Sequence, residues 1–297
     1  MAVVATGFFD GVHLGHRAVL DRMVTEARNR GTESVVVTFW PHPRNVLQQD
    51  ADTLRLLNSL SEKRALCLAA GADCFEVLPF SRDFARLTAE GFVREYLRNR
   101  FDADTLVLGH DHRLGCDPFP NPEAMAKALR SAGVEPVFVD DCTAPGGRNV
   151  SSTLIRRLLA EGKVSDAASL LGYGYPLTGV VVAGAKIGRK IGYPTANMSL
   201  YEPLKLIPAG GVYIVRAEVL GRTFRGICNI GHRPTLDDGR GRTIETHLLD
   251  FNEDIYGLDI TVTFLERLRD EQKFASLKEL SLQLAEDEKA ARNFDGY

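Results

Sequence analysis

Two histidines three positions apart lie near the start of the chain, in the stretch Thr6-Gly-Phe-Phe-Asp-Gly-Val-His13-Leu-Gly-His16. The apolar run before it, residues 2–5, predicts a buried strand. Apolar residues at helical spacing from 17 to 30 predict an amphipathic helix behind it. A tight turn between a strand and a helix points backbone N–H groups and the positive end of the helix dipole toward one place. Because both imidazoles fall on that turn, the stretch predicts a polyphosphate site.

The spacing His13-x-Gly-His16 resembles the signature of nucleotidyltransferases, which move a nucleoside monophosphate from a triphosphate onto an acceptor. In that chemistry the acceptor phosphate attacks the α-phosphate of ATP, and the protein positions both and stabilises the developing charge. The resemblance implies that both histidines bind ATP phosphates. A plain turn with surface histidines is the alternative, and the length of the matching stretch disfavours it. The ATP-binding residues expected on this turn are Gly7, Phe9, Asp10 and Gly15.

The composition of the 297-residue chain is that of a globular protein with two domains. A net charge of −3 disfavours a general nucleic-acid binder, which is usually basic. Five scattered cysteines without a Cys-x-x-Cys pair favour reduced thiols. No apolar run approaches the ~20 residues of a membrane span, and the N-terminus does not resemble a signal peptide. We therefore expect a cytoplasmic protein with neither a membrane nor a nucleic acid as its partner.

Strand and helix patterns alternate through the first half of the chain. Strands are expected at 2–5, 34–39, 74–78, 104–109 and 134–139, with helices at 17–30, 59–70, 89–100 and 122–132. Five such alternations predict an α/β fold with a doubly wound parallel sheet and right-handed crossovers. Ligands bind beyond the carboxyl ends of the strands in such sheets. The loops after Ala5, Phe39, Leu108 and Val139 should therefore share one edge.

The last of these loops leads into Arg148-Asn-Val-Ser151-Ser152-Thr153-Leu-Ile-Arg156. Ser151 or Ser152 is expected to cap a helix that runs to Ala160. A helix start rich in hydroxyls, with an arginine in its first turn, suits a second phosphate cradle. A simple N-cap is the commoner reading of such a segment on its own. Its place on the same sheet edge as the histidine turn favours the phosphate site.

The pattern changes beyond a hinge at residues 172–176. Strands are expected at 177–183, 211–220, 223–230, 243–250 and 258–268, and a helix at 276–292. Successive strands without helices between them predict an antiparallel β-barrel, with a sandwich as the alternative. We place the domain boundary near Gly174, which gives domains at 1–173 and 174–297.

Within the second half, residues 184–197 form a segment rich in glycine and basic residues. Such loops suit phosphates, which bind backbone N–H groups and point charges. The segment is not a P-loop, because Ala185 stands where the lysine is required. Composition alone favours a cationic turn between strands.

A longer resemblance decides between these readings. Gly188-Arg189-x-x-Gly-x-Pro-Thr195-Ala-Asn197 resembles the signature of riboflavin kinases, and residues 229–235, 244–250 and 267–274 are similar to later blocks of that family. Residues 8–16, 41–43 and 151–156 resemble the adenylyltransferase half of bacterial bifunctional FAD synthetases. Because the blocks cover nearly the whole chain in order, the sequence is identified as a member of the bifunctional riboflavin kinase/FMN adenylyltransferase family.

The resemblance implies a role for each matching residue. In the second half, Thr195 and Asn197 would hold Mg²⁺ and the ATP phosphates, and Glu245 would be the general base for the riboflavin 5′-hydroxyl. Phosphoryl transfer needs this neutralised charge and one proton acceptor. Further contacts implied there are Gly188 and Arg189 with ATP, and Arg269 with the flavin.

In the first half, the resemblance implies that His13 and His16 bind the ATP phosphates. Ser151, Ser152, Thr153 and Arg156 would close over these phosphates with Arg148, while His42 and Asp111 are weaker candidates for FMN or ATP contacts. The implied substrates are riboflavin, FMN and ATP.

Three positions, in two segments, depart from the family pattern. The usual Asp/Asn-Phe-x-Phe-Gly block reads Asp111-His-Arg-Leu-Gly115 here, and Phe8 replaces a small polar residue. These departures bear on flavin affinity and pose in the first domain, and they leave the phosphate-handling residues intact. Two alternatives stay open at this level: a nucleotidyltransferase for another phosphate acceptor, and a flavin-binding protein with one inactive domain, which the altered block supports.

Overall fold

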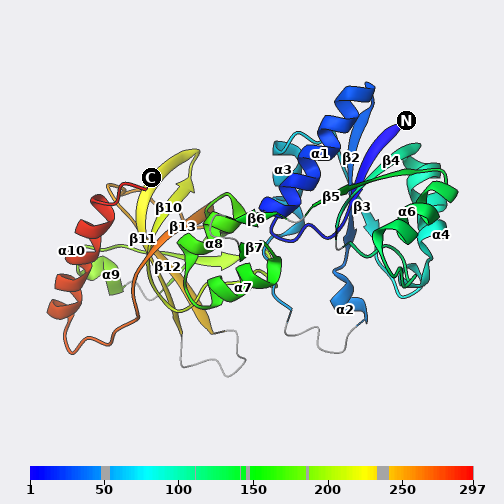
Figure 1. Ribbon diagram of the computed structural model, residues 1–297. Coiled ribbons are helices and arrows are strands. Elements are labelled where there is room, and N and C mark those ends of the chain that lie inside the picture. Colours follow the sequence, from blue (N-terminus) through cyan, green and yellow to red (C-terminus); the bar gives the residue numbers. More distant parts are fainter. Residues whose placement is uncertain are drawn as a thin grey trace. The chain divides into compact units, whose positions relative to one another are not determined.

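The computed structural model describes residues 1–47, 54–110, 112–140, 142–144, 148–184, 187–232 and 241–296. Contacts within the chain divide it into two units, Met1–Ser152 and Thr153–Tyr297 (Figure 1). This structural division precedes the hinge expected near Gly174, because the two helices before the hinge belong to the second unit.

The first unit contains a five-stranded parallel sheet in the order β3-β2-β1-β4-β5. Its strands are β1 (Ala2–Thr6), β2 (Glu33–Trp40), β3 (Cys74–Pro79), β4 (Ala103–Gly109) and β5 (Glu135–Val139). The chain winds from β1 out to β3, then returns to place β4 on the other side of β1. The predicted doubly wound sheet is confirmed, and its topological switch point lies between β1 and β4.

Helices cover both faces of this sheet, and each face has its own apolar core (Figure 1). Helices α1 (Leu14–Arg30) and α3 (Leu60–Ala69) contribute to one core, and α4 (Ala89–Phe92) and α6 (Pro122–Ser131) to the other. The helix predicted at 89–100 is present as α4, a π-helical turn at Val93–Arg98 and α5 (Asn99–Phe101). A capping box at Ser59 and Glu62 opens α3, as predicted.

The shorter elements of the first unit lie in its loops. They are α2 (Pro43–Leu47), a 3₁₀ turn at Phe84–Arg86, and the two-residue strands β6 (Thr143–Ala144) and β7 (Arg148–Asn149). Helix α1 begins three residues earlier than the predicted Arg17, at Leu14, because His13 caps it. His16 therefore lies in the first turn of the helix.

The second unit contains a closed antiparallel barrel in the order β10-β11-β12-β9-β8-β13. Its strands are β8 (Tyr175–Val182), β9 (Ala196–Leu200), β10 (Gly211–Val219), β11 (Arg222–His232), β12 (Arg242–Leu248) and β13 (Asp259–Arg269). The barrel prediction is confirmed. Strand β9 was not predicted, because its first residues belong to the glycine-rich segment that we interpreted as a loop. Without β9 the barrel would be open between β12 and β8.

Side chains of the barrel strands alternate between its interior and its outer surface. Tyr213 and Phe264 are fully buried and pack edge to face in the interior. On the outer surface, Val212, Ile214 and Ile227 form an apolar cluster with Ala291 of the terminal helix α10 (Leu277–Arg292). The same β10 strand therefore serves two cores.

Helices α7 (Ser152–Ala160) and α8 (Val164–Leu171) precede the barrel strands in the sequence. A four-residue helix, α9 (Ile187–Lys190), lies in the connection between β8 and β9. The turn between α7 and α8 packs on β13: a Cβ at Gly162 would lie 2.7 Å from Arg267. In addition, the Ala209 N–H donates to the Leu159 carbonyl (2.9 Å). These contacts place the two helices with the barrel.

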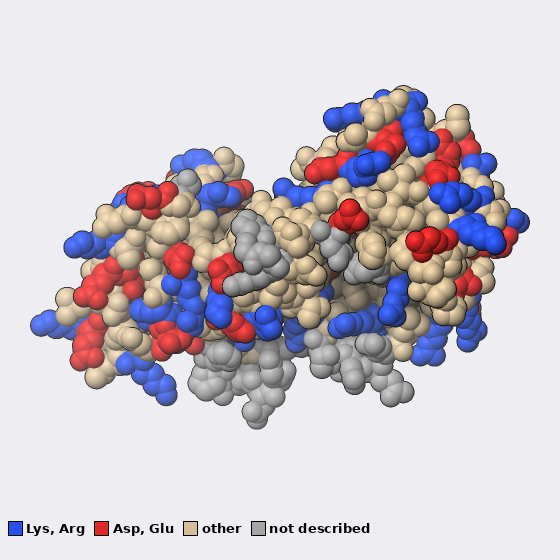
Figure 2. Space-filling view, in the orientation of Figure 1, with Lys and Arg blue, Asp and Glu red and all other residues tan. Residues whose placement is uncertain are grey.

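Both basic and acidic side chains are present on the described parts of each unit on the face seen in Figure 2. Among the described residues, no helix combines the length and the apolar character needed to cross a membrane.

Candidate active sites

The turn between β1 and α1 is held in an uncommon backbone conformation. Phe9, Gly11 and Val12 have φ angles of 45°, 89° and 36°. Left-handed conformations cost non-glycine residues of the order of 1–3 kcal/mol each, and they cluster where a function requires the shape. His13 caps α1, because its Nδ1 accepts a hydrogen bond from the His16 backbone N–H (3.4 Å). The turn thus places two imidazoles at a helix N-terminus, where anions bind.

The two imidazole rings are stacked. Their centroids lie 3.7 Å apart at 15°, and the ring of Phe9 lies edge-on to His16 at 5.4 Å. A Cβ at Gly15 would come within 3.3 Å of the His13 ring, so that glycine leaves room for the stack. Burial, followed by the neighbouring His13, Lys63 and His112, holds the pKa of His16 well below its ordinary value. At neutral pH, His16 is therefore an uncharged hydrogen-bonding group.

Asp10 connects the turn to two other segments. Its buried carboxylate accepts from the backbone N–H groups of Leu57 (3.0 Å) and Asn58 (3.2 Å), which precede α3. Its carbonyl accepts from the Ser152 hydroxyl (2.8 Å), at the start of α7. The predicted serine cradle is therefore anchored to the histidine turn through Ser152. The predicted ATP contact of Asp10 itself stays a prediction.

Other residues predicted for this site are distributed around the same sheet edge. The ring of His42, after β2, lies 5.1 Å from that of Phe8, which packs against Phe39 (5.3 Å). Gly7 follows β1 directly, and its N–H donates to Val37 (3.1 Å). Ser151 immediately precedes α7.

Several predicted contacts in the first half lie beyond what the structure describes. Asp111 and the side chain of Arg148 are outside the described residues. Thr153 and Arg156 lie on α7 in the second unit, so their approach to the histidines stays a prediction.

A cavity of about 660 Å³ lies beyond the carboxyl end of β4. Its lining residues include His110, His112, Arg113, Asp117, Phe119 and Phe138. His112 takes the place of one family aromatic, and it is also among the groups that lower the pKa of His16. Leu114 takes the place of the other, and it is buried in the core. The cavity and the histidine turn thus follow the two strands that flank the switch point.

The second site lies on the outer surface of the barrel. Glu245 on β12 pairs with Asn197 on β9 and with Asn229 on β11. Residues that pair across strands project from the same face, so the three polar side chains form one row. The Thr195 hydroxyl, just before β9, donates to Oε2 of the half-buried Glu245 (3.4 Å). Thr195, Asn197 and Glu245, predicted from one motif and a separate strand, are therefore brought together.

The loop before Thr195 is tightly closed around Gly188. The Gly188 carbonyl accepts from the N–H groups of Ile191 (3.1 Å) and Tyr193 (2.9 Å). A Cβ at Gly188 would lie 2.1 Å from the Tyr193 carbonyl oxygen, which excludes any other residue without a backbone shift. The loop conformation therefore depends on this glycine, and it carries Arg189 and Thr195 on the same cavity wall.

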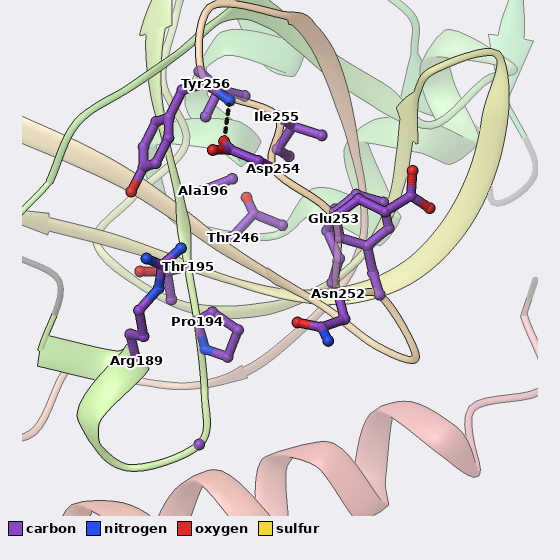
Figure 3. A pocket seen from close by; sticks show the side chains of 14 residues that line it. Arg189, Pro194, Thr195, Ala196, Thr246, Asn252, Glu253, Asp254, Ile255 and Tyr256 are labelled. Carbon is purple, nitrogen blue, oxygen red and sulfur yellow. Dashed lines mark hydrogen bonds between the residues drawn. The ribbon is translucent and has the colours of Figure 1, made fainter.

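That cavity has a volume of about 430 Å³, and Figure 3 shows the side chains that line it. Its lining includes Arg189, Thr195, Val181, Thr246, Leu248 and the segment 251–256. The sequence analysis assigned no role to residues 251–256. The available signal was their position directly after the block at 244–250, with Phe251 and Tyr256 among polar residues.

Comparisons with known proteins identify the family. A model described as FAD synthetase matches residues 1–154, and one described as riboflavin kinase matches residues 171–294. A protein of Listeria monocytogenes is 37% identical over 98% of this chain and 92% of its own length, and one of Escherichia coli K12 is 39% identical over 99% and 93%. Both are named bifunctional riboflavin kinase/FMN adenylyltransferase. The chain belongs to this family.

One solved structure extends the likeness to the whole fold. A crystal structure from Streptococcus pneumoniae, described as a macrolide-efflux protein, has a TM-score of 0.91 and 34% identity. The match covers 99% of this chain and 95% of that one. The elements of both units along this chain therefore have counterparts in that structure.

In this family, phosphoryl transfer from ATP calls for a divalent metal, and the barrel offers suitable ligands. Thr195 and Asn197 supply hydroxyl and amide oxygens beside the Glu245 carboxylate, which are hard donors of the kind that Mg²⁺ prefers. A Cβ at Gly184 would lie 2.2 Å from the Asn197 amide, so this glycine keeps the space around it open. Among the described residues, no cluster of three His, Cys, Asp or Glu could enclose an ion alone. The residues therefore fit an ion shared with ATP phosphates.

Arg269, expected to contact the flavin, is engaged with α10. Its Nε and Nη2 donate to the buried carboxylate of Asp287 (3.0 and 2.7 Å), and its Nη1 donates to the Asp270 carbonyl (3.1 Å). Gln283 donates to the same carboxylate (3.1 Å). In this structure Arg269 thus attaches the terminal helix to β13, and its flavin contact stays a prediction.

We expect Asp287→Ala to destabilise the second unit by about 3 kcal/mol, because it leaves the Arg269 guanidinium without its carboxylate. That figure is at the lower end for buried pairs, since the Arg269 side chain is 16% exposed. Urea unfolding followed by circular dichroism measures the change. Asp250→Ala, which removes an exposed ion pair with Arg292, is the matched control. Equal effects of the two substitutions would contradict the role of Asp287 in holding α10.

Proposed function

We propose that the chain makes FMN and then FAD, with one reaction in each half. Residues 174–297 phosphorylate riboflavin with ATP, and residues 1–173 transfer the adenylyl group of a second ATP to FMN with release of pyrophosphate. Family membership supports the pair of reactions. The observation that carries the assignment of residues is the contact between Thr195 and Glu245 at the edge of the barrel cavity.

In the kinase reaction, Glu245 accepts the proton of the riboflavin 5′-hydroxyl while that oxygen attacks the γ-phosphorus of ATP. The bond from the γ-phosphorus to the β–γ bridging oxygen breaks, and ADP leaves. Thr195 and Asn197 would hold Mg²⁺, which neutralises the phosphate charge when it is bound. Arg189 and the backbone N–H groups of the Gly188 loop bind the remaining phosphate oxygens. Each of these groups acts by charge or by position, which is what phosphoryl transfer requires.

The barrel cavity suits the adenosine part of ATP. Its lining includes the apolar Val181, Leu248 and Ile255 and the aromatic Tyr256. Arg189 and Thr195, which also line it, are the proposed phosphate contacts; Figure 3 labels both. Its volume of about 430 Å³ falls within the range of small-molecule sites. ATP bound in this orientation brings its phosphates to Thr195, the cavity residue that contacts Glu245.

In the adenylyl transfer, an FMN phosphate oxygen attacks the α-phosphorus of ATP, and the bond to the α–β bridging oxygen breaks. His13 and His16 donate hydrogen bonds to the phosphates at the N-terminus of α1. Gly7, Phe9, Asp10 and Gly15 shape the turn against the nucleotide. Further groups proposed for the phosphate site come from the start of α7 and the segment before it: Arg148, Ser151, Ser152, Thr153 and Arg156. We assign pyrophosphate release to this half.

The cavity beyond β4 is the proposed FMN site. It offers Arg113 and two histidines for the phosphate, and Phe119 and Phe138 for the flavin ring. In this proposal, the rings of Phe119 and Phe138 provide the flavin contacts that the family aromatics at positions 112 and 114 would otherwise make. His42 and Asp111 are proposed as further flavin contacts here, and Arg269 in the kinase half. We also propose a cytoplasmic location, because all five cysteines are free thiols.

A time course tests the proposal directly. Purified protein with riboflavin, ATP and Mg²⁺ should produce FMN first and FAD afterwards, resolved by chromatography. Replacement of Mg²⁺ by a chelator should stop both steps. Accumulation of FMN without FAD would overturn the adenylyltransferase assignment, and absence of any conversion would favour a flavin-binding protein.

A further inference from the structure

His247 lies where the pairing between β12 and β9 ends. The ladder joins Glu245 to Asn197 and Thr246 to Ala196. Pro194, two residues before β9, has no N–H with which to extend it. Instead, Nδ1 of His247 donates a hydrogen bond to the Pro194 carbonyl (2.8 Å). A side chain of β12 thus holds the backbone at the point where the strand pairing stops.

The residue before Pro194 also contacts His247. The Tyr193 ring lies 5.2 Å from the His247 ring at 64°, an edge-to-face arrangement. Burial, followed by the nearby Glu288 carboxylate of α10, raises the pKa of Tyr193. His247 therefore contacts both residues of the segment Tyr193–Pro194, the first through its ring and the second through a hydrogen bond.

This segment leads directly into Thr195, which contacts Glu245 and lines the barrel cavity. Glu245 and His247 are two residues apart on β12, so their side chains project from the same face. One strand therefore carries both the proposed base and the group that holds the loop opposite it. A shift of Pro194 would move the Thr195 hydroxyl relative to Glu245.

We propose that His247 is a positioning residue of the kinase site. It holds the Pro194 carbonyl so that the Thr195 hydroxyl stays directed toward the ATP phosphates and Glu245. This inference rests on the proposed function, because it takes the barrel cavity as the ATP site. His247 acts through Pro194 and Thr195 and does not touch the reacting atoms.

Two substitutions separate this role from general structural support. His247→Ala removes the hydrogen bond, whereas His247→Asn keeps an N–H donor at the same distance along the side chain as Nδ1. Loss of a group that orients a ligand of a bound ion typically costs 10- to 100-fold in affinity or activity. We expect about this loss for His247→Ala, both in riboflavin phosphorylation and in binding of a non-hydrolysable ATP analogue with Mg²⁺. His247→Asn should recover most of it.

Calorimetric binding of the analogue to the full-length protein, repeated in a His16→Ala background to separate the barrel site from the proposed second ATP site, and steady-state kinetics supply the readouts. The KM for riboflavin and the rate of FMN adenylylation should be unchanged in both variants. Tyr193→Phe, which keeps the ring and removes the hydroxyl, should have a smaller effect than His247→Ala. Unchanged analogue binding in His247→Ala, or a His247→Asn variant as impaired as His247→Ala, would overturn the proposal.

The same experiment distinguishes this inference from the proposed function. Analogue binding does not require a general base, so it reports on the loop even if Glu245 has another role. Analogue binding that is absent from the wild-type barrel would instead refute the assignment of the cavity to ATP. If His247→Ala is too unstable to assay, His247→Leu, which fills the space and removes the donor, should show the same loss of analogue binding, and wild-type binding in that variant would overturn the proposal.

Discussion

Glu245→Gln should reduce riboflavin phosphorylation by about 100- to 10,000-fold, the usual contribution of a general base. Glutamine preserves the size of the side chain and an oxygen for the Thr195 hydroxyl, which lies 3.4 Å from the carboxylate. It cannot accept the proton of the attacking hydroxyl at neutral pH. The loss should therefore appear in kcat, with little change in the affinity for ATP. The measurement is FMN formation from riboflavin under saturating ATP and Mg²⁺.

The same variant should adenylylate added FMN at the wild-type rate, because the histidine turn lies in the other unit. Glu218→Gln is the matched control, since Glu218 is an exposed strand carboxylate at the far end of β10 and away from the polar row. Loss of both activities in Glu245→Gln would contradict the division of the reactions between the two halves. A rate equal to that of the control would remove Glu245 from the mechanism.

His16→Ala should have the reverse effect. We expect about a 100- to 1,000-fold loss of FMN adenylylation, comparable to the removal of one donor that stabilises a developing charge. The substitution also removes the ring that stacks on His13 at 3.7 Å, so the second imidazole loses its fixed orientation. Riboflavin phosphorylation measured on the same preparation should be unchanged, which shows that the protein is folded. Wild-type adenylylation in this variant would refute the assignment of His16.

His16 should also make stability depend on pH. Its pKa in the folded chain is lowered, chiefly by burial, so between that value and the ordinary value of 6.5 the unfolded chain binds a proton that the folded chain does not. The free energy of unfolding should therefore rise with pH across this window and fall as the pH is lowered through it. The slope for one proton is at most about 1.4 kcal/mol per pH unit. Urea unfolding of wild type and His16→Ala at several pH values should show a smaller slope in the variant.

The sequence by itself determined the fold class, because its signals are local. Periodicity and turn residues placed five parallel strands and most helices of the first unit, and the capping box at Ser59 placed the start of α3. Local patterns failed at β9, where glycines and Pro194 dominate the segment and the strand is stabilised by its two neighbours, β8 and β12. The early start of α1 was missed because histidine is an unusual cap.

The motifs also determined which residues to examine, since phosphate chemistry requires particular side chains at close spacing. Only the tertiary structure decided which distant residues meet. It brought Glu245 on β12 into contact with Thr195, next to β9, and it joined Asp10 to the segment before α3 by hydrogen bonds. It also paired Arg269 with Asp287 on the terminal helix. It also formed the cavity that includes residues 251–256 and placed His247 against Pro194. These contacts depend on strand register and helix packing between segments far apart in the chain, which no local pattern encodes.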